Sequence, residues 1–239
     1  MISRYTRPEM ARLWTDEHRL GIWLEIEVSV CEALAKRGVI PADAVREMRA
    51  KAKVDAERVA EIELEVKHDV IAFVTAAAES VGPAGRYLHL GLTSSDVIDT
   101  AFAVQLTHSA HLLLRGLDGL LAAVRTLAEK YRDTRMIGRT HGVHAEPITF
   151  GLKAASWYAE LCRGFERIEI AQREIATGKL SGAVGTYAHL SPEVEAEVLP
   201  RLGLVPETVA TQIIPRDRHA AFFSALAIVA ASIERIALE

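Results

Sequence analysis

The amino-acid sequence predicts an all-α protein, with an N-terminal helical domain over residues 1–95 and the first part of a long-helix bundle over residues 96–239. Two observations support this class. Apolar residues recur at steps of three and four along several long stretches, and no stretch shows the convincing alternation of a half-buried strand. Half of the 239 residues are hydrophobic, which is enough to bury a sizeable core in one or two domains.

The first 80 residues should form several helices. Residues 6–9, reading TRPE, are typical of a helix start, and apolar residues keep helical spacing from 20 to 34 before a glycine at 38 ends the stretch. Residues 4 and 5 lie ahead of this helix as an extended tip. Two shorter helices are expected from residue 41 and over residues 57–66. The second leads into a Lys-His-Asp triplet at 67–69, whose simplest interpretation is solvated charge on a helix surface.

A polar loop over residues 88–96, reading LHLGLTSSD, ends in helix-capping residues. Ser94 or Ser95 with Asp96 could merely cap the next helix and complement its dipole. Three hydroxyls in a row exceed that need, because Thr93 and Ser94 at a helix N-terminus would also suit a carboxylate or phosphate. From Asp96 an apolar stripe continues for about 35 residues, which at 1.5 Å per residue gives roughly 50 Å. A helix of that length is typical of an extended bundle.

Chemically useful side chains are densest between the first two long helices. Residues 138–147, reading GRTHGVHAEP, are interpreted as an irregular segment at one end of the bundle, where a ligand has access. Because imidazole exchanges protons near neutral pH, this segment is the candidate for a proton-transfer site. Its polar members are Arg139, Thr140, His141, His144 and Glu146.

Two more long helices are expected over residues 150–175 and from 215 to the end. The glycine-rich stretch 178–186 between them lacks the strand of a dinucleotide fingerprint and the ending of a P-loop, so it is interpreted as a crossover loop. The last helix stops at Glu239 in mid-pattern, as in a truncated bundle. The longest apolar run, 220–231, is too short and too interrupted to span a bilayer.

Composition argues against several classes of ligand. The formal net charge of −4 comes without a basic block that would suggest nucleic acid or anionic lipid. Cys31 and Cys162 lie in apolar stripes without metal or redox spacing, which predicts buried, reduced thiols in a cytoplasmic protein. His108 and His111 have the spacing of a metal pair but no third ligand, which favours surface histidines.

Four stretches together resemble the adenylosuccinate lyase family of the fumarase/aspartase superfamily: SRYTRPEM, EVKHDVIAF, LHLGLTSSDVIDT and GRTHGVHAEPITFGLK. Other members typically follow their Thr-His or Thr-Gln block with Leu-Gln rather than Gly-Val-His, so the resemblance is specific. It covers the whole chain. It implies a fumarase/aspartase-type bundle that cleaves adenylosuccinate to AMP and fumarate, and the succinyl carboxamide ribotide of purine synthesis likewise. It also implies a homotetramer with shared active sites and no metal or organic cofactor.

The resemblance also implies a role for individual residues in a general acid/base β-elimination. His141 would protonate the leaving nitrogen, with His68 nearby, while another group removes a proton next to a carboxylate. Thr140, His144 and Glu146 would support these groups. The implied contacts to the nucleotide substrate are Arg4, Tyr5, Lys67, Asp69, His89, Thr93, Ser94 and Gln212.

One departure is large, because the signature loop SSxMPxKxNP does not occur in these 239 residues. That loop carries the serine expected to act as base, so the chain resembles roughly the first half of the enzyme and should be inactive alone. Two alternatives remain open: another fumarate-releasing lyase, such as the argininosuccinate-cleaving one, or a catalytically silent helical assembly module.

Overall fold

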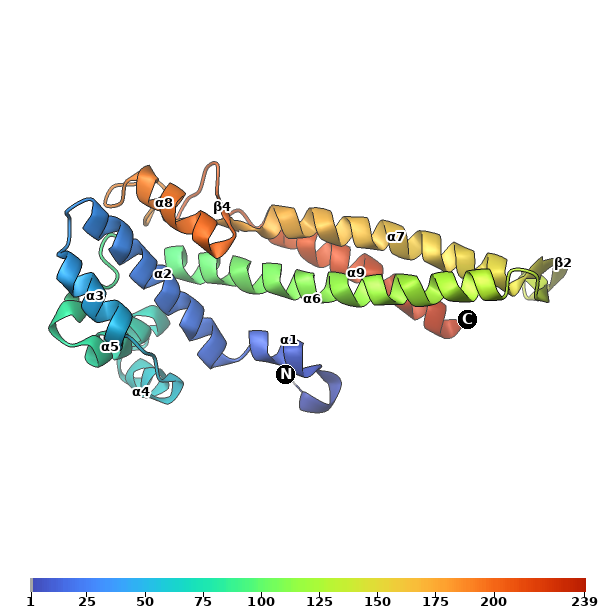
Figure 1. The fold of residues 1–239 in the computed structure, drawn as a ribbon, viewed down its shortest axis with the longest axis horizontal. Coiled ribbons are helices and arrows are strands. Elements are labelled where there is room, and N and C mark those ends of the chain that lie inside the picture. Colours follow the sequence, from blue (N-terminus) through green and yellow to red (C-terminus); the bar gives the residue numbers. More distant parts are fainter. Residues whose placement is uncertain (1) are drawn as a thin grey trace. The chain divides into compact units, whose positions relative to one another are not determined.

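The computed structural model describes residues 2–239, and most of them are helical, which confirms the all-α class (Figure 1). The chain divides into two compact units. The first unit comprises Met1–Ser109 and Ala176–Arg216, as far as they are described, and the second comprises Ala110–Ile175 and Asp217–Glu239. The two domains expected from the sequence, 1–95 and 96–239, remain a prediction.

The first unit opens with short elements that correct two expectations. Residues 4 and 5 are not extended, because the N–H of Tyr5 donates to the carbonyl of Ile2 at 3.0 Å and closes a 3-10 turn. The first helical stretch is also broken in two, because Thr15 caps a new helix by accepting the N–H of His18 at 3.2 Å. The elements are η1 (Ser3–Tyr5), α1 (Pro8–Leu13), α2 (Asp16–Lys36), α3 (Ala42–Lys51), α4 (Ala56–Val66), α5 (Asp69–Val81) and η2 (Pro83–Tyr87).

Helix α2 lies in the middle of this unit and is buried on most sides from Ile26 to Leu34. Trp23 of α2 and Phe73 of α5 pack edge to face with ring centroids 5.3 Å apart, and both are at most 2% exposed. Because α2 is covered on several faces, its polar residues must find partners inside the unit.

The later part of the first unit is a crossover segment with short elements. Strand β3 (Thr177–Gly178) pairs in parallel with β4 (Val205–Pro206), so the expected loop starts with a strand. A side chain at Gly178 would lie 2.7 Å from the Leu199 side chain, so any larger residue there would have to displace buried Leu199. Between the strands lie α8 (Pro192–Val198) and η3 (Leu199–Leu202).

The predicted long helix is confirmed as α6 (Ser94–Lys130), with 37 residues. It starts two residues before Asp96, where the apolar stripe was expected to begin, because Ser94 and Ser95 already lie in its first turn. Its later part belongs to the second unit, with α7 (Phe150–Ile175) and α9 (Asp217–Leu238). Helices α7 and α9 run side by side (Figure 1), and Lys153 pairs with Glu239 between them at 2.9 Å.

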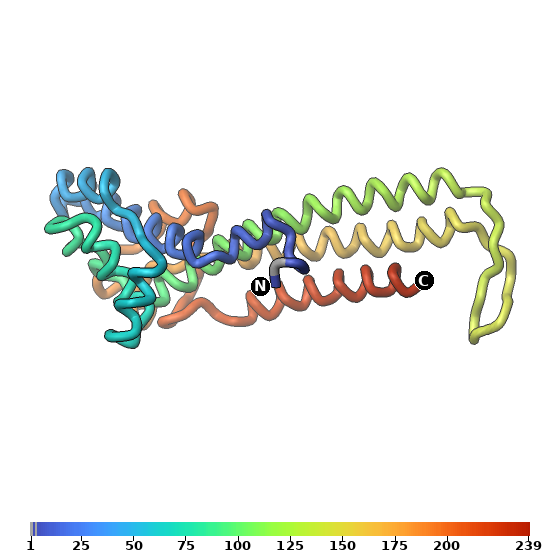
Figure 2. Tube along the Cα trace, turned by 90° about the horizontal axis from the view of Figure 1, so that it is seen from below, coloured from blue at the N-terminus to red at the C-terminus, as the bar shows by residue number. Residues whose placement is uncertain are grey.

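The segment expected to be irregular is instead an antiparallel hairpin of β1 (Arg135–Thr140) and β2 (Val143–Thr149). Figure 2 shows it beyond the ends of the α6 and α7 helices that it joins. The pairing shifts register between Ile137 and Arg139, and a side chain at Gly138 would lie 2.6 Å from the carbonyl oxygen of Glu146. A bulge and a closely packed glycine therefore hide the alternation that would have revealed the strands.

The expectation that both cysteines are buried also needs correction. Cys31 is buried and burial raises its pKa to about 12, but Cys162 is only half-buried. Helix α9 is long and apolar enough, by length and composition alone, to cross a membrane. A helix packed in a bundle meets the same criterion, and α9 packs along α7.

Candidate active site

The predicted site residues fall in both compact units. Four of them, Thr140, His141, His144 and Glu146, lie on the hairpin of the second unit. The others lie in the first unit, where three loops meet at the N-terminal end of α6. These loops are defined by residues 88–94, 178–187 and 207–216.

His68 joins the α4–α5 junction to the start of α6. Its Nδ1 accepts the N–H of Ile71 at 3.4 Å and thereby caps α5, which places the ring proton on Nε2. That Nε2 faces the hydroxyl of Ser94 at 3.5 Å. Lys67 before it is exposed, and Asp69 after it caps its own helix by accepting the N–H of Val70 at 2.7 Å. The triplet therefore supplies more than surface charge, because it positions the imidazole of His68 beside the hydroxyl of Ser94, which is itself a predicted substrate contact.

The first turn of α6 is built on a buried carboxylate. Asp96 accepts the N–H of Thr93 at 2.9 Å and pairs with the ammonium of Lys179, and both of these charged side chains are fully buried. The N–H of Gly182 donates to the same carboxylate at 3.2 Å. The capping interpretation is confirmed for Asp96. The pair also ties loop 178–187 to loop 88–94.

A second buried carboxylate, Asp99, holds the loop that carries Gln212. It accepts the N–H of Ile214 at 2.8 Å and the guanidinium of Arg216 at 2.9 and 3.0 Å. Gly185, with a positive φ of 77°, would place a side chain 2.1 Å from the carbonyl oxygen of Ala210. The backbones of loop 178–187 and loop 207–216 therefore approach each other closely at Gly185 and Ala210. Gln212 itself is exposed.

Loop 178–187 is also held by Glu195 of α8. This buried carboxylate accepts the N–H of Leu180 at 2.6 Å and the hydroxyl of Tyr187 at 2.7 Å. Burial, and then the nearby Glu195, raise the pKa of Tyr187 to about 12, so the phenol stays neutral and donates. Loop 178–187 is thus held by carboxylates from α6 and α8.

His141 occupies the turn of the hairpin. It and Gly142 both have positive φ, 52° and 73°, as in the tight turns that match the twist of two strands. Thr140 pairs with Val143 across this turn, and His144 pairs with Arg139. The hairpin residues Thr140, His141 and His144 are exposed in this chain, as is Glu146.

Several of the predicted site residues adopt a left-handed backbone conformation. Among the described non-glycine residues, positive φ occurs at Lys67, His89, His141 and Tyr187. Three of the four are predicted site residues. A non-glycine residue in this conformation carries strain that the surrounding structure must hold, and such strain clusters at functional sites.

Arg4 and Tyr5 lie apart from the loops just described. Both are exposed, and the guanidinium of Arg4 stacks 4.7 Å from the ring centroid of Tyr5. The structure therefore places these two predicted contacts together on η1 but gives them no described partner among the other site residues.

Sequence reasoning missed the buried carboxylates and the lysine that hold the loops: Glu27, Asp96 as an ion-pair partner, Asp99, Lys179 and Glu195. Glu27 gives a usable signal, since it interrupts the apolar stretch of α2 as a charged residue on a buried face. Lys179 gives none, because a lysine in a glycine-rich loop is ordinarily exposed.

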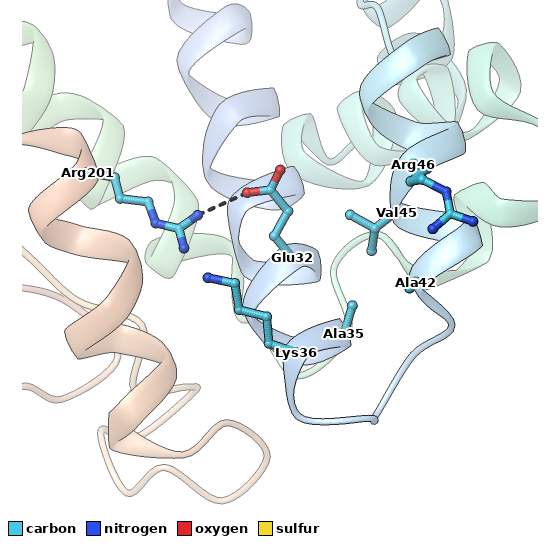
Figure 3. A pocket seen from close by; sticks show the side chains of 7 residues that line it. All are labelled: Glu32, Ala35, Lys36, Ala42, Val45, Arg46 and Arg201. Atoms are coloured by element: carbon cyan, nitrogen blue, oxygen red, sulfur yellow. Dashed lines mark hydrogen bonds and ion pairs between the residues drawn. The ribbon is translucent and has the colours of Figure 1, made fainter.

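A pocket of about 300 Å³ in the first unit lies elsewhere, between α2, α3 and Arg201 (Figure 3). Two of its cations are already neutralised: Lys36 pairs with Glu197 at 2.6 Å, and Arg201 pairs with Glu32 at 3.0 Å. None of the predicted site residues lines it, so we assign it no role. Within residues 2–239, no three His, Cys, Asp or Glu side chains are grouped to hold a metal ion.

The fold belongs to a lyase family: the family model described as Lyase matches residues 3–239, and the chain belongs to that family. It is similar to an adenylosuccinate lyase from Synechocystis, with 56% identity, and to one from Bacillus subtilis, with 48% identity, each over the whole of this chain. The chain spans 56% of the length of each of these relatives. These similarities confirm the resemblance seen in the sequence.

Solved structures agree on the architecture. A fumarate lyase from Mesorhizobium sp. BNC1 matches 98% of this chain and 56% of its own length, with a TM-score of 0.91 and 32% identity. A 3-carboxy-cis,cis-muconate lactonizing enzyme from Pseudomonas putida covers 98% of this chain and 55% of its own, with a TM-score of 0.90 and 29% identity. The long-helix fold predicted from the sequence is therefore confirmed.

Proposed function

We propose that the full-length protein cleaves adenylosuccinate to AMP and fumarate, and the succinyl carboxamide ribotide of purine synthesis to its carboxamide product and fumarate. The observation that carries the proposal is the similarity of the whole chain to relatives named adenylosuccinate lyase, at 56 and 48% identity. The argininosuccinate-cleaving and silent-module alternatives have no comparable support. A cytoplasmic location and a reaction without metal or organic cofactor belong to the same proposal.

The proposed reaction is a β-elimination. A base removes the proton next to a carboxylate, the carbon–nitrogen bond breaks, and its electron pair goes to the nitrogen, which takes a proton from His141. His68 and Ser94, at 3.5 Å, with Lys67 and Thr93, would hold the anionic substrate and stabilise charge on the developing carbanion. The base would come from the signature loop SSxMPxKxNP, which these 239 residues do not contain.

The test is release of fumarate, followed by ultraviolet absorbance, from adenylosuccinate and from argininosuccinate. The full-length protein should act on the first and not the second. The 239-residue chain alone should turn over neither, because it carries the proposed acid but not the base-bearing loop. Activity on argininosuccinate, or none on either substrate by the full-length protein, would contradict the proposal.

We further propose a homotetramer in which several chains complete each site. Helix α9 leaves Phe223, Ile228 and Ile233 between 46 and 50% exposed, and α7 leaves Ile170 at 50%. Apolar side chains in such numbers on one helix pair are expected to be covered by other chains.

Light scattering of the full-length protein at micromolar concentration should give a mass of four chains. Ile228→Glu on α9 should reduce that mass, because it places a charge in the proposed interface. Ile71→Glu is the matched control, since Ile71 is 50% exposed on α5 of the first unit. A stable wild-type monomer would contradict the tetramer.

Thr93→Ala should weaken substrate binding more than turnover, because the hydroxyl is proposed to hold the ground state. We expect KM to rise about two- to tenfold, the range for one neutral hydrogen bond, with kcat little changed. Thr126→Ala is the control, because that hydroxyl is exposed and bonds within α6 at 2.9 Å. A loss in kcat with unchanged KM would assign Thr93 to the chemical step instead.

A further inference from the structure

His89 is held by one buried carboxylate at two points. Glu27 of α2 accepts the backbone N–H of His89 through Oε2 at 2.6 Å, and its Oε1 lies 2.6 Å from the ring Nδ1. The Glu27 side chain is 1% exposed and the His89 side chain 25%. One helical turn later on α2, the Cys31 thiol donates to the carbonyl of Tyr87 at 3.3 Å, and Tyr87 ends η2 just before the loop that carries His89.

The arrangement has a cost that packing alone does not explain. A buried carboxylate is unfavourable unless strong donors surround it, and His89 adopts a left-handed backbone with φ of 64°. An apolar residue at position 27 would fill the same space without desolvating a charge. The two short contacts therefore point to a requirement on His89 itself.

The contacts determine how the imidazole is presented. An ionised carboxylate only accepts hydrogen bonds, so the proton on the Glu27 side of the ring belongs to Nδ1. Nε2 is then the ring atom left for other partners, and no hydrogen bond to it occurs among the described residues. Carboxylate–histidine pairs fix the ring orientation and tautomer in the same way at metal and catalytic sites.

We propose that Glu27 is a positioning residue for His89: it holds the Nδ1–H tautomer and the ring orientation so that Nε2 accepts a hydrogen bond from an O–H or N–H group of the substrate. This inference rests on the proposed function, in which His89 contacts the nucleotide. Glu27 itself touches no substrate, since it is buried in α2.

Replacing Glu27 by glutamine reverses the pattern of donors at constant size. The glutamine side chain has one acceptor oxygen and one amide nitrogen that donates. It can satisfy the backbone N–H of His89 only by turning that amide nitrogen toward Nδ1. The ring proton then moves to Nε2, and the charge that stabilised the pair is lost.

The kinetic test uses the full-length protein. Glu27→Gln should raise KM for adenylosuccinate about tenfold with a smaller change in kcat, because Nε2 then carries the ring proton and can no longer accept a hydrogen bond from the substrate. Glu25→Gln on the same helix is the matched control, because Glu25 pairs with exposed Arg49 and should leave KM unchanged. Glu27→Asp keeps the carboxylate on a side chain shortened by one methylene, so its KM should lie between those of the wild type and Glu27→Gln.

A double-mutant cycle separates positioning from general support of the loop. If Glu27 acts through His89, Glu27→Gln combined with His89→Ala should have the KM of His89→Ala alone. Additive effects on KM, or an unchanged KM in Glu27→Gln, would overturn the proposal.

Neutron diffraction of the same proteins gives a readout that does not depend on activity. Wild type should carry a deuteron on Nδ1 of His89 and none on Glu27, and Glu27→Gln should carry it on Nε2. A deuteron on Glu27 Oε1 in wild type would overturn the proposal. If the full-length protein releases no fumarate, the proposed function fails, while the diffraction result still reports on the pair.

Discussion

His141→Ala should lower kcat of the full-length protein by about 10² to 10⁴, with much less effect on KM. This is the usual loss when one general acid is removed, because the leaving nitrogen must then depart without its proton. Turnover is measured as fumarate release at saturating adenylosuccinate. An unimpaired variant would remove His141 from the mechanism.

The position of His141 demands a second variant. With φ of 52°, an alanine there adopts a left-handed backbone that it tolerates poorly, so the hairpin turn could distort. Asparagine enters that conformation more readily and has no titrating group, so His141→Asn should keep the turn and show the same loss. His111→Ala removes an exposed imidazole from α6 and should leave turnover unchanged. A much smaller loss in His141→Asn than in His141→Ala would assign the effect to the turn.

Helices were predictable because their period and their caps are local. The 37-residue α6 follows from a sustained apolar stripe, and its start follows from the hydroxyls and Asp96 near residue 94. The break after α1 was missed because Thr15 caps α2 inside an otherwise helical region, and a single threonine does not reveal that use.

The hairpin was missed for a different physical reason. Its strands carry a bulge near Gly138, a proline at 147 and a His-Gly turn in place of the usual Asn-Gly. Each feature is a loop signal in sequence. The antiparallel register of the two strands, and the close approach of Gly138 to the carbonyl of Glu146, are visible only in the structure.

Some residues of the candidate site could be predicted from the sequence, and others could not. Histidines and hydroxyls near glycines could be singled out from the sequence, since such side chains have few structural duties on loops. The groups that hold them could not, because Asp96 and Lys179 are 83 residues apart and only the fold makes them partners. Their burial turns two ordinary surface residue types into a central support of the first unit.

The buried Asp96–Lys179 pair should be the largest single contribution to stability in the candidate site. Asp96→Ala removes the carboxylate that accepts from Thr93, Lys179 and Gly182. The ammonium of Lys179 would then be left buried, and among the described residues its remaining partner would be the carbonyl of Gly182 at 3.2 Å. Breaking one side of such a pair costs about 3–5 kcal/mol in unfolding free energy. Urea denaturation followed by circular dichroism measures the loss.

The same substitution at an exposed pair sets the scale. Asp43 pairs with Arg46 on α3, where the two side chains are 84 and 75% exposed, so Asp43→Ala should cost about 1 kcal/mol or less. Replacing both buried partners, with Asp96→Leu and Lys179→Met, should recover much of the stability because no charge remains unpaired. That double variant still lacks the carboxylate that accepts the Thr93 N–H. Its KM for adenylosuccinate should therefore exceed that of the wild type even though its stability is largely recovered. Equal losses from Asp96→Ala and Asp43→Ala would show that the buried pair does not hold this part of the site.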